Sequence, residues 1–133
     1  MYINNVFEEA KILAKDIDAV AVSKGPGSYT GLRIGVSSAK GLCYALDKPL
    51  ISVSTLESLA HQVKINEGII ISMLDARRME VYSAVFNHKH EQVRDIKAEI
   101  LTEDSYADLL KENKVYFVGN GVAKTKQLIN HPN

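Results

Sequence analysis

The sequence predicts an α/β protein built from two lobes. Amphipathic helices and short β-branched strands alternate along residues 2–63, the order expected of a lobe in which helices cover a sheet. After a polar connector at residues 64–68, the pattern changes to a meander of strands followed by helix, strand and helix. The 133 residues suffice for one domain or two half-size lobes. The change of pattern favours two lobes, residues 1–64 and 65–133.

The elements of the first lobe are predicted from periodicity and from the residues that begin or end them. The first strand ends in the turn Gly25-Pro26-Gly27. Pro49 ends the helix after that turn, because proline biases the residue before it away from helix. Ser54 and Glu57 form a capping box that begins the last helix. The predicted elements are a helix at 2–15, a strand at 17–23, a helix at 30–46, a strand at 50–53 and a helix at 55–63.

The second lobe is predicted to begin with a meander of three strands. Thr102 is expected to cap a helix after the meander, with Glu103 and Asp104 in its first turn, where the helix dipole favours negative charge. A further strand and helix flank a short glycine-containing turn. The predicted strands are 69–74, 79–86, 92–101 and 115–118, and the last helix is 122–129.

Composition and charge exclude several classes of protein. Sixteen basic residues balance sixteen acidic ones, so no large basic field is available to bind nucleic acid unaided. No window approaches the roughly 18 apolar residues that a membrane helix needs. The single cysteine, Cys43, lies in a predicted helix without an intrachain partner, which fits a reducing compartment. These features predict a soluble, cytoplasmic protein without membrane contact.

The glycine-rich segment 24–35 joins a strand to a helix, where backbone amides and a helix N-terminus can hold an anion. Its spacing matches neither a Walker loop nor the dinucleotide fingerprint, and Ser28 lacks the flanking glycines of a nucleophile elbow. The structural alternative is that the glycines permit a tight turn while Ser28 or Thr30 caps the helix. The candidate nucleotide or phosphate residues are Gly25, Gly27, Ser28, Thr30 and Arg33.

The helix after this loop is apolar nearly all round and needs cover on both sides. The stripe that can pack on the sheet consists of Leu32, Val36, Ala39, Cys43 and Leu46. The other stripe is rich in small residues, which allow another backbone to approach closely, and consists of Gly31, Gly35, Ser38, Leu42 and Ala45. The helix at 2–15 could provide that cover. The two helices together nevertheless offer more apolar surface than one small lobe can hide, which predicts a protein interface. The predicted partner-binding residues are Ile3, Val6, Phe7, Ala10, Gly31, Gly35, Ser38 and Leu42.

The residues predict neither a catalytic constellation nor a metal site. His88 and His90 lie one residue apart in a predicted turn, but no carboxylate or cysteine cluster completes a site, so solvated histidines are the simpler interpretation. Asp75 with Arg77 and Arg78 forms either a polar site at a strand end or a turn ion pair.

Several motifs resemble those of the TsaB (YeaZ) group in the glycoprotease-like TsaB/TsaD family of the bacterial threonylcarbamoyladenosine pathway. They are Ala21 to Gly35, Ala39 to Leu42, Val53 to Ala60 and Met73 to Tyr82, so the resemblance covers nearly the whole chain. It implies the actin/Hsp70/sugar-kinase (ASKHA) type of two-lobed fold with RNase H-like lobes. It also implies binding to the catalytic paralogue TsaD, with the ATPase subunit TsaE as a further partner. Homodimerisation through the same helices and only indirect contact with tRNA are implied as well.

Two departures from the family pattern shape the expected function. The family begins with a strand and hairpin before its first helix, so we expect the first lobe to be shortened at its N-terminus. We also expect the second lobe to end early. Without the opening strands, we expect weak or absent binding of ATP or ADP at a shared interface. The metal-binding H-M-E-G-H segment of the catalytic paralogues corresponds to residues 55–59, where Thr55 and Leu59 replace both histidines. The resemblance therefore implies a non-catalytic scaffold without metal or cofactor, supporting modification of the adenosine beside the tRNA anticodon. The alternatives are a glycoprotease-like peptidase and a nucleotide-binding module.

Overall fold

The computed structural model describes residues 2–129, 131 and 132, which form two compact units. The first unit contains the chain up to Lys24 and Ser28–Val53, and the second contains Gly25–Gly27 and the chain from Ser54 onward. The helix α3 (Thr55–Ala60) belongs to the second unit, because it buries Leu56 and Ala60 in the core of that unit. The assignment of residues 1–64 and 65–133 to two lobes of a larger fold stays a prediction.

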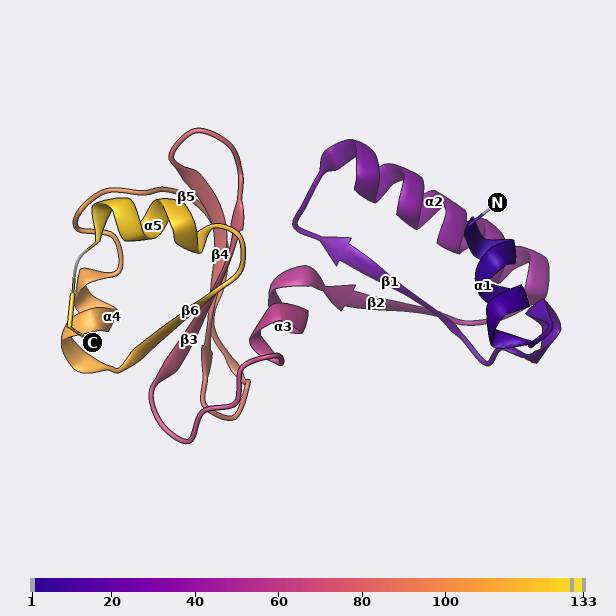
Figure 1. The fold of residues 1–133 in the computed structure, drawn as a ribbon, viewed down its shortest axis with the longest axis horizontal. Helices are drawn as coiled ribbons and strands as arrows, with labels where there is room; N and C mark the ends of the chain where they lie inside the picture. The colour runs from indigo at the N-terminus through magenta and orange to yellow at the C-terminus, as the bar shows by residue number, and fades with distance from the viewer. Residues whose placement is uncertain (1, 130, 133) are drawn as a thin grey trace. The chain divides into compact units, whose positions relative to one another are not determined.

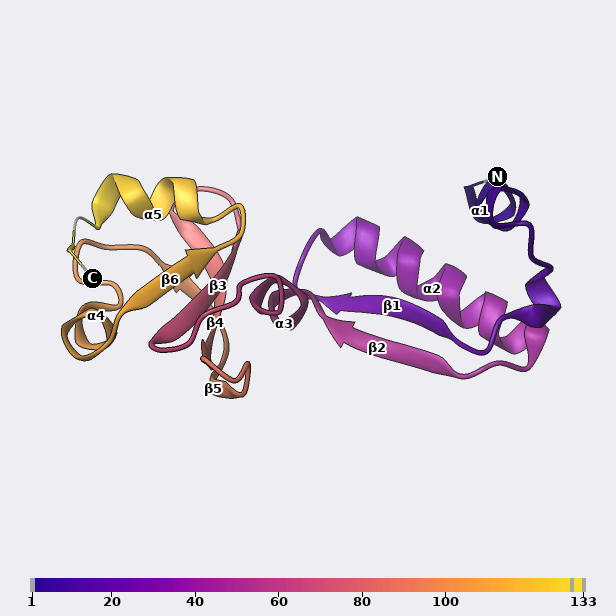
Figure 2. The same cartoon turned by 60° about the horizontal axis from the view of Figure 1, so that its bottom comes forward.

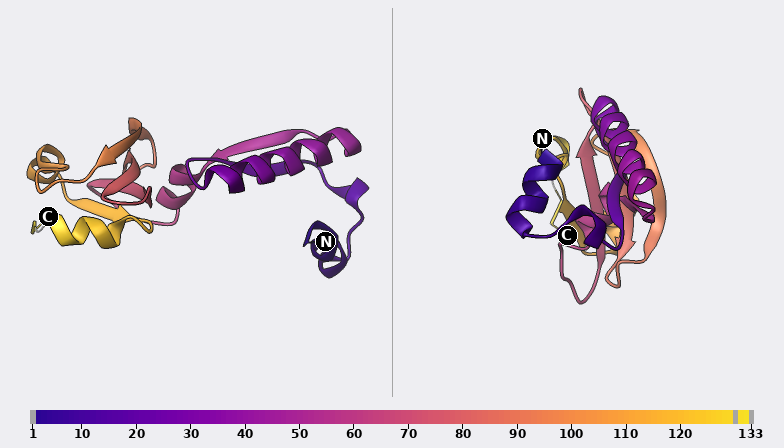
Figure 3. Two further views of the ribbon diagram at one scale, coloured as in Figure 1. Left: turned by 90° about the horizontal axis from the view of Figure 1, so that it is seen from above. Right: turned by 90° about the vertical axis from the view of Figure 1, so that its right-hand side faces the viewer.

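The first unit is organised around a strand, a helix and a second strand. Its strands β1 (Val20–Gly25) and β2 (Leu50–Ser54) form a two-stranded sheet, and they are joined by the helix α2 (Tyr29–Leu46). Figure 1 shows both strands pointing the same way, which makes this a parallel crossover unit. The helix lies along one face of the sheet (Figures 2 and 3).

The first helix is shorter than predicted. α1 spans Tyr2–Ala10, and a separate turn of 3-10 helix follows at Ala14–Asp16. Lys11 has a φ of 55°, and the amides of Lys11 and Ile12 donate to the carbonyls of Glu8 and Phe7. These two bonds form a Schellman motif, which ends the helix although its apolar periodicity continues.

The second unit contains a mixed four-stranded sheet in the order β5-β4-β3-β6. β4 pairs antiparallel with β3 and with β5, whereas β6 pairs parallel with β3. The register places Ser72 opposite Ala84 and Val118, and it shifts in β4 between Ser83 and Val85. β5 and β6 are the two edge strands. The strands are β3 (Ile69–Asp75), β4 (Glu80–Asn87), β5 (Gln92–Ile100) and β6 (Val115–Val118).

Helices cover both faces of this sheet, so each face has its own core (Figure 1). On one face, α3 packs against a cluster of five buried residues: Leu56, Ala60, Ile70, Ala84 and Phe86. On the other face lie α4 (Ala107–Glu112) and α5 (Val122–Leu128). That core is built from Ile69, Ile71, Met73, Val81, Val85, Leu101, Tyr106, Leu110 and Val115. β3 and β4 are almost fully buried because they contribute to both cores.

The helix expected from Thr102 begins later. Tyr106, not Thr102, is the N-cap residue of α4, and it adopts a left-handed conformation with φ 64°. The Thr102 amide instead donates to the Ser105 hydroxyl at 2.9 Å, which closes a local turn. This turn allows Leu101 and Tyr106 to enter the same core.

Candidate functional site

The two faces of α2 differ in burial. The predicted sheet-facing stripe is confirmed, because Ala39 and Cys43 are buried and Leu32, Val36 and Leu46 are half-buried. The stripe of small residues lies exposed, apart from the half-buried Leu42. A Cβ built on Gly35 would meet no atom within 4 Å. No described part of the chain therefore fills the space over Gly35.

The surface of α1 is also uncovered. None of its nine residues is buried, and Ile3 and Val6 are 44% and 62% exposed. Phe7 is half-buried and lines a shallow surface cavity of about 440 Å³ with Ile12 and Leu13. Ala10, at the end of α1, is exposed. The predicted partner-binding positions thus retain apolar surface on both helices, and their role stays a prediction.

Ser28 has the structural role that the sequence left open. Its hydroxyl accepts a hydrogen bond from the Gly31 amide at 3.3 Å, which caps the N-terminus of α2. Thr30 is exposed within the helix, and the Arg33 guanidinium lies over the Tyr29 ring at 5.5 Å from its centroid. Because the Ser28 hydroxyl accepts this backbone hydrogen bond, the structure supports the interpretation of the segment as a turn followed by a helix cap.

The glycines before Ser28 belong to the second unit. Gly25 is buried and ends β1 with a φ of 97°, a conformation that favours glycine, whereas Gly27 is exposed. Their predicted contact with a nucleotide or phosphate stays a prediction.

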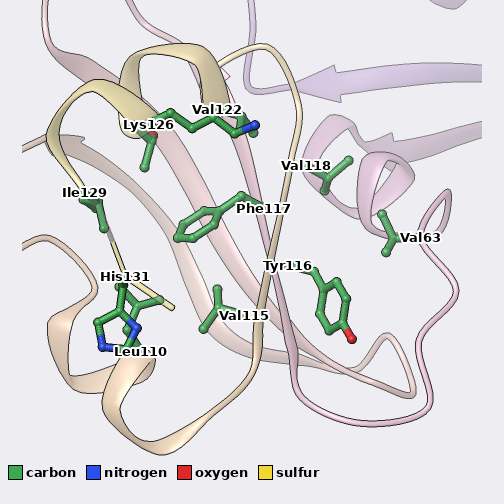
Figure 4. Close-up of a pocket in the computed structure, with 11 residues that line it drawn as sticks. Val63, Leu110, Val115, Tyr116, Phe117, Val118, Val122, Lys126, Ile129 and His131 are labelled. Carbon is green, nitrogen blue, oxygen red and sulfur yellow. The ribbon is translucent and has the colours of Figure 1, made fainter. Parts of the chain in front are cut away.

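An apolar pocket of about 440 Å³ lies along β6 in the second unit, and the sequence did not predict it. Figure 4 shows side chains from β6, α4 and α5 around it, with Val63 from the segment after α3. Its ionisable lining residues are Tyr116, Lys126 and His131. The only sequence signal was the apolar run at 115–118, which indicates a buried strand, whereas β6 is an edge strand. Such a pocket suits an apolar side chain or a small apolar ligand.

Asp75 does not pair with the two arginines of its turn, contrary to the ion-pair interpretation. Its carboxylate accepts from the Lys124 ammonium at 3.0 Å and from the Arg77 amide at 2.6 Å. These bonds, with Lys124 the larger influence, lower the pKa of Asp75. Lys124 comes from α5, distant in sequence, so no local pattern could have indicated this pair.

Glu99 is the centre of a polar cluster on the sheet face that carries α4. One carboxylate oxygen accepts from the Arg94 guanidinium and the Tyr106 hydroxyl, each at 2.9 Å, and also from the Ser83 hydroxyl. Burial alone would raise the pKa of Glu99, but the hydrogen bonds from Ser83 and Tyr106 and the charge of Arg94 outweigh it, so the pKa is lowered. Burial raises the pKa of Tyr106 to about 12, and the bond to Glu99 adds to this effect.

His88 and His90 were both expected to be solvated, but only His88 is. His88 is exposed, but the His90 ring stacks on His61 with centroids 4.5 Å apart, and its Nε2 donates to the Val63 carbonyl at 2.8 Å. Across the described residues, no three His, Cys, Asp or Glu side chains are grouped to hold a metal ion. At the start of α3, the Ser54 hydroxyl accepts from the Glu57 amide at 3.4 Å, which is one of the two hydrogen bonds of the predicted capping box.

Comparison with known proteins places these features in a family. The family model described as "TsaD: tRNA N6-adenosine threonylcarbamoyltransferase" matches residues 1–131. The chain is 36% identical over 132 residues to the tRNA threonylcarbamoyladenosine biosynthesis protein TsaB of Bacillus subtilis, covering 96% of this chain and 57% of that protein. It is 38% identical over 97 residues to the Escherichia coli protein of the same name, covering 66% of this chain and 42% of the relative. The chain thus spans about half the length of these relatives.

Solved structures show the same similarity. YeaZ from Pseudomonas aeruginosa aligns with a TM-score of 0.75 at 26% identity, covering 98% of this chain and 62% of that one. A second structure, described as an uncharacterised protein with similarity to peptidase YEAZ from the same organism, aligns with a TM-score of 0.61 at 29% identity, over 74% of this chain and 47% of that one. The match to YeaZ, together with the family model, confirms the predicted α/β fold of the actin/Hsp70/sugar-kinase type with RNase H-like lobes. No helix in the described part of the chain is long and apolar enough to cross a membrane.

Proposed function

The chain belongs to the TsaB/TsaD family and resembles its TsaB (YeaZ) members, and from this premise we propose that it is a non-catalytic subunit that binds the catalytic paralogue TsaD. The proposed complex modifies the adenosine beside the tRNA anticodon, with TsaE as a further partner, and it works in the cytoplasm where tRNA is found. The curated relatives carry names that assign them to tRNA threonylcarbamoyladenosine biosynthesis, which supports the pathway.

The observation that carries this proposal is the uncovered small-residue stripe of α2. Gly31, Gly35 and Ser38 are exposed on the helix. The face of α2 that packs on the sheet is a different one, where Ala39 and Cys43 are buried. Small side chains allow a second helix backbone to approach closely, which increases the van der Waals contact that an interface can form. The exposed apolar side chains of α1 offer further surface for binding a partner. A second copy of this chain is the alternative occupant of this stripe.

The peptidase alternative is weakened by the position of Ser28. Its hydroxyl caps α2, and the glycine spacing of a nucleophile elbow is absent from the sequence around it. Replacement of both paralogue histidines by Thr55 and Leu59 supports a role without a metal at that position.

Substitution of Ser38 by arginine tests the interface. Purified TsaD should be retained by the unmodified chain in a pull-down and should no longer be retained by Ser38→Arg, since a long charged side chain would stand where a backbone must approach. Gly35→Arg should act in the same way, because its Cβ enters open space and the helix gains propensity when glycine is replaced. Size-exclusion chromatography with light scattering would show whether a homodimer disappears at the same time.

Ser37→Arg is the matched control. Ser37 is exposed and adjacent to Ser38, but successive residues project about 100° apart around a helix, so the same substitution points away from the stripe. Retention of TsaD by Ser37→Arg and its absence with Ser38→Arg would support the proposal. Equal retention by both variants would contradict it.

A further inference from the structure

We propose that the β3–β4 turn is an RNA contact, in which Arg77 and Arg78 bind phosphate groups of the tRNA backbone. This inference rests on the proposed function, because that function brings the chain to a tRNA. It adds a direct contact to a subunit for which only indirect contact was expected.

The turn is held in one conformation by an ammonium group beneath it. Lys124 is only 12% exposed, and its Nζ donates to the Asp75 carboxylate at 3.0 Å and to the carbonyls of Arg78 and Glu80 at 2.5 and 3.1 Å. The Asp75 amide in turn donates to the Asn120 side chain at 2.9 Å. Both sides of the turn are therefore fixed to α5 and the loop before it.

Arg77 and Arg78 both occupy the left-handed region, with φ values of 70° and 46°. Two consecutive residues of this kind are costly without glycine, and such strain persists only where the surrounding structure imposes it. Strained positions are common at binding sites, where they fix the direction of a side chain. Here the strained residues are the two that carry guanidinium groups.

Neither of the two acidic residues that flank the turn, Asp75 and Glu80, forms an ion pair with these arginines. Asp75 is paired with Lys124, and Arg77 contacts it only through its backbone amide. Both arginines are exposed, and no hydrogen bond or ion pair of either guanidinium is found among the described residues. Two positive charges are thus presented to solvent on a fixed turn, while the whole chain has no net charge.

The chemistry of guanidinium groups favours phosphate as the ligand. Arginine binds phosphate oxygens through paired N–H donors, and a fixed backbone reduces the entropy cost of binding. The shape of the site favours RNA over a free nucleotide. Nucleotides bind in concave sites, whereas neither arginine lines either of the two cavities described above. A polyanionic backbone can be contacted by an exposed turn.

Binding of a fluorescently labelled tRNA transcript to the full chain, followed by anisotropy, tests this inference. We expect Arg77→Gln/Arg78→Gln to weaken binding by about tenfold or more at low salt, and to reduce the slope of log K against log salt concentration by about 2, one for each phosphate group that is no longer neutralised. Arg77→Lys/Arg78→Lys, which keeps both charges, should recover part of the affinity. The matched control is Lys89→Gln/Lys97→Gln, which removes two exposed positive charges elsewhere in the second unit.

The outcomes separate the site from general electrostatics and from the proposed function. An equal loss of affinity in the lysine control, an unchanged affinity in the glutamine variant, or no tRNA binding by the unmodified chain would each overturn the inference. Calorimetric titration with ATP is a further arm, and ATP binding that depends on Arg77 and Arg78 while tRNA binding does not would assign the turn to a nucleotide instead. The TsaD pull-down is run on the same variants, so failure of the proposed function appears there independently of RNA binding.

Discussion

Neutralising Glu99 should destabilise the second unit by about 2 kcal/mol at pH 7. In Glu99→Gln the ion pair with Arg94 is removed, and with both side chains 25% exposed it contributes no more than about 1 kcal/mol. The hydrogen bonds from Ser83 and Tyr106 change from a charged to a neutral acceptor, which accounts for about another 1 kcal/mol. Urea unfolding followed by circular dichroism measures the difference. Glu103→Gln, at an exposed position, is the control and should change little.

The pH dependence of the same variant gives a stricter test. The pKa of Glu99 is lowered in the folded chain, so its stabilising contribution is complete above the unfolded pKa of about 4.3 and is lost as the pH falls through the lowered folded value. The difference between the unmodified chain and Glu99→Gln should therefore shrink as the pH is lowered below about 4. A difference that is the same at pH 7 and in acid, or absent at pH 7, would refute the reasoning.

Tyr106, two glycines and the loop before α2 give three further predictions. Because the folded pKa of Tyr106 is raised to about 12, its contribution to stability is present below the unfolded value of about 10 and is lost as the pH rises towards 12. Tyr106→Phe should remove this alkaline loss of stability, and an ultraviolet titration of tyrosinate should lose its latest-titrating group; an unchanged titration would contradict the assignment. Gly119→Ala should destabilise by more than about 2 kcal/mol in thermal or urea unfolding, because φ is 113° and the new Cβ would lie 2.0 Å from the Met73 carbonyl oxygen. Gly41→Ala, on α2 with nothing within 4 Å, should be neutral or stabilising, and equal effects at both glycines would contradict this account. Calorimetric titration of the chain with ATP or ADP should show weak or no binding, and a micromolar affinity abolished by Thr30→Ala would restore the nucleotide-binding alternative.

Much of the fold was predictable because it is encoded locally. The helix α2 begins where Ser28 caps it and ends just before Pro49, and β3 to β6 lie within a residue or two of their predicted bounds. Two elements whose bounds differ from the prediction have local geometry that periodicity does not detect. Lys11 ends α1 in a left-handed conformation that is usually taken by glycine, and Tyr106 begins α4 in the same region of φ.

The candidate sites depend on contacts between segments that are distant in sequence. Asp75 and Lys124 meet because β6 pairs parallel with β3 and places α5 at the end of β3. The stacking of His61 on His90 likewise joins the end of α3 to the β4–β5 turn. Arg77 and Arg78 are notable in the sequence, but only the structure removes Asp75 as their partner. The exposed stripe of α2 was predicted because it depends on one helix alone.

The edge strand β5 has a consequence for how this protein behaves at high concentration. Val93, Ile96 and Ile100 are exposed on a strand with one unpaired side, a combination that invites sheet-to-sheet aggregation. Charged Asp95 and Lys97 flank Ile96, and when like strands pair in parallel and in register, each charge lies beside an identical one and opposes the pairing. Because that protection is electrostatic, colloidal stability should depend on ionic strength, and crystallisation or storage in concentrated salt would favour fibrils or precipitate seeded along this strand.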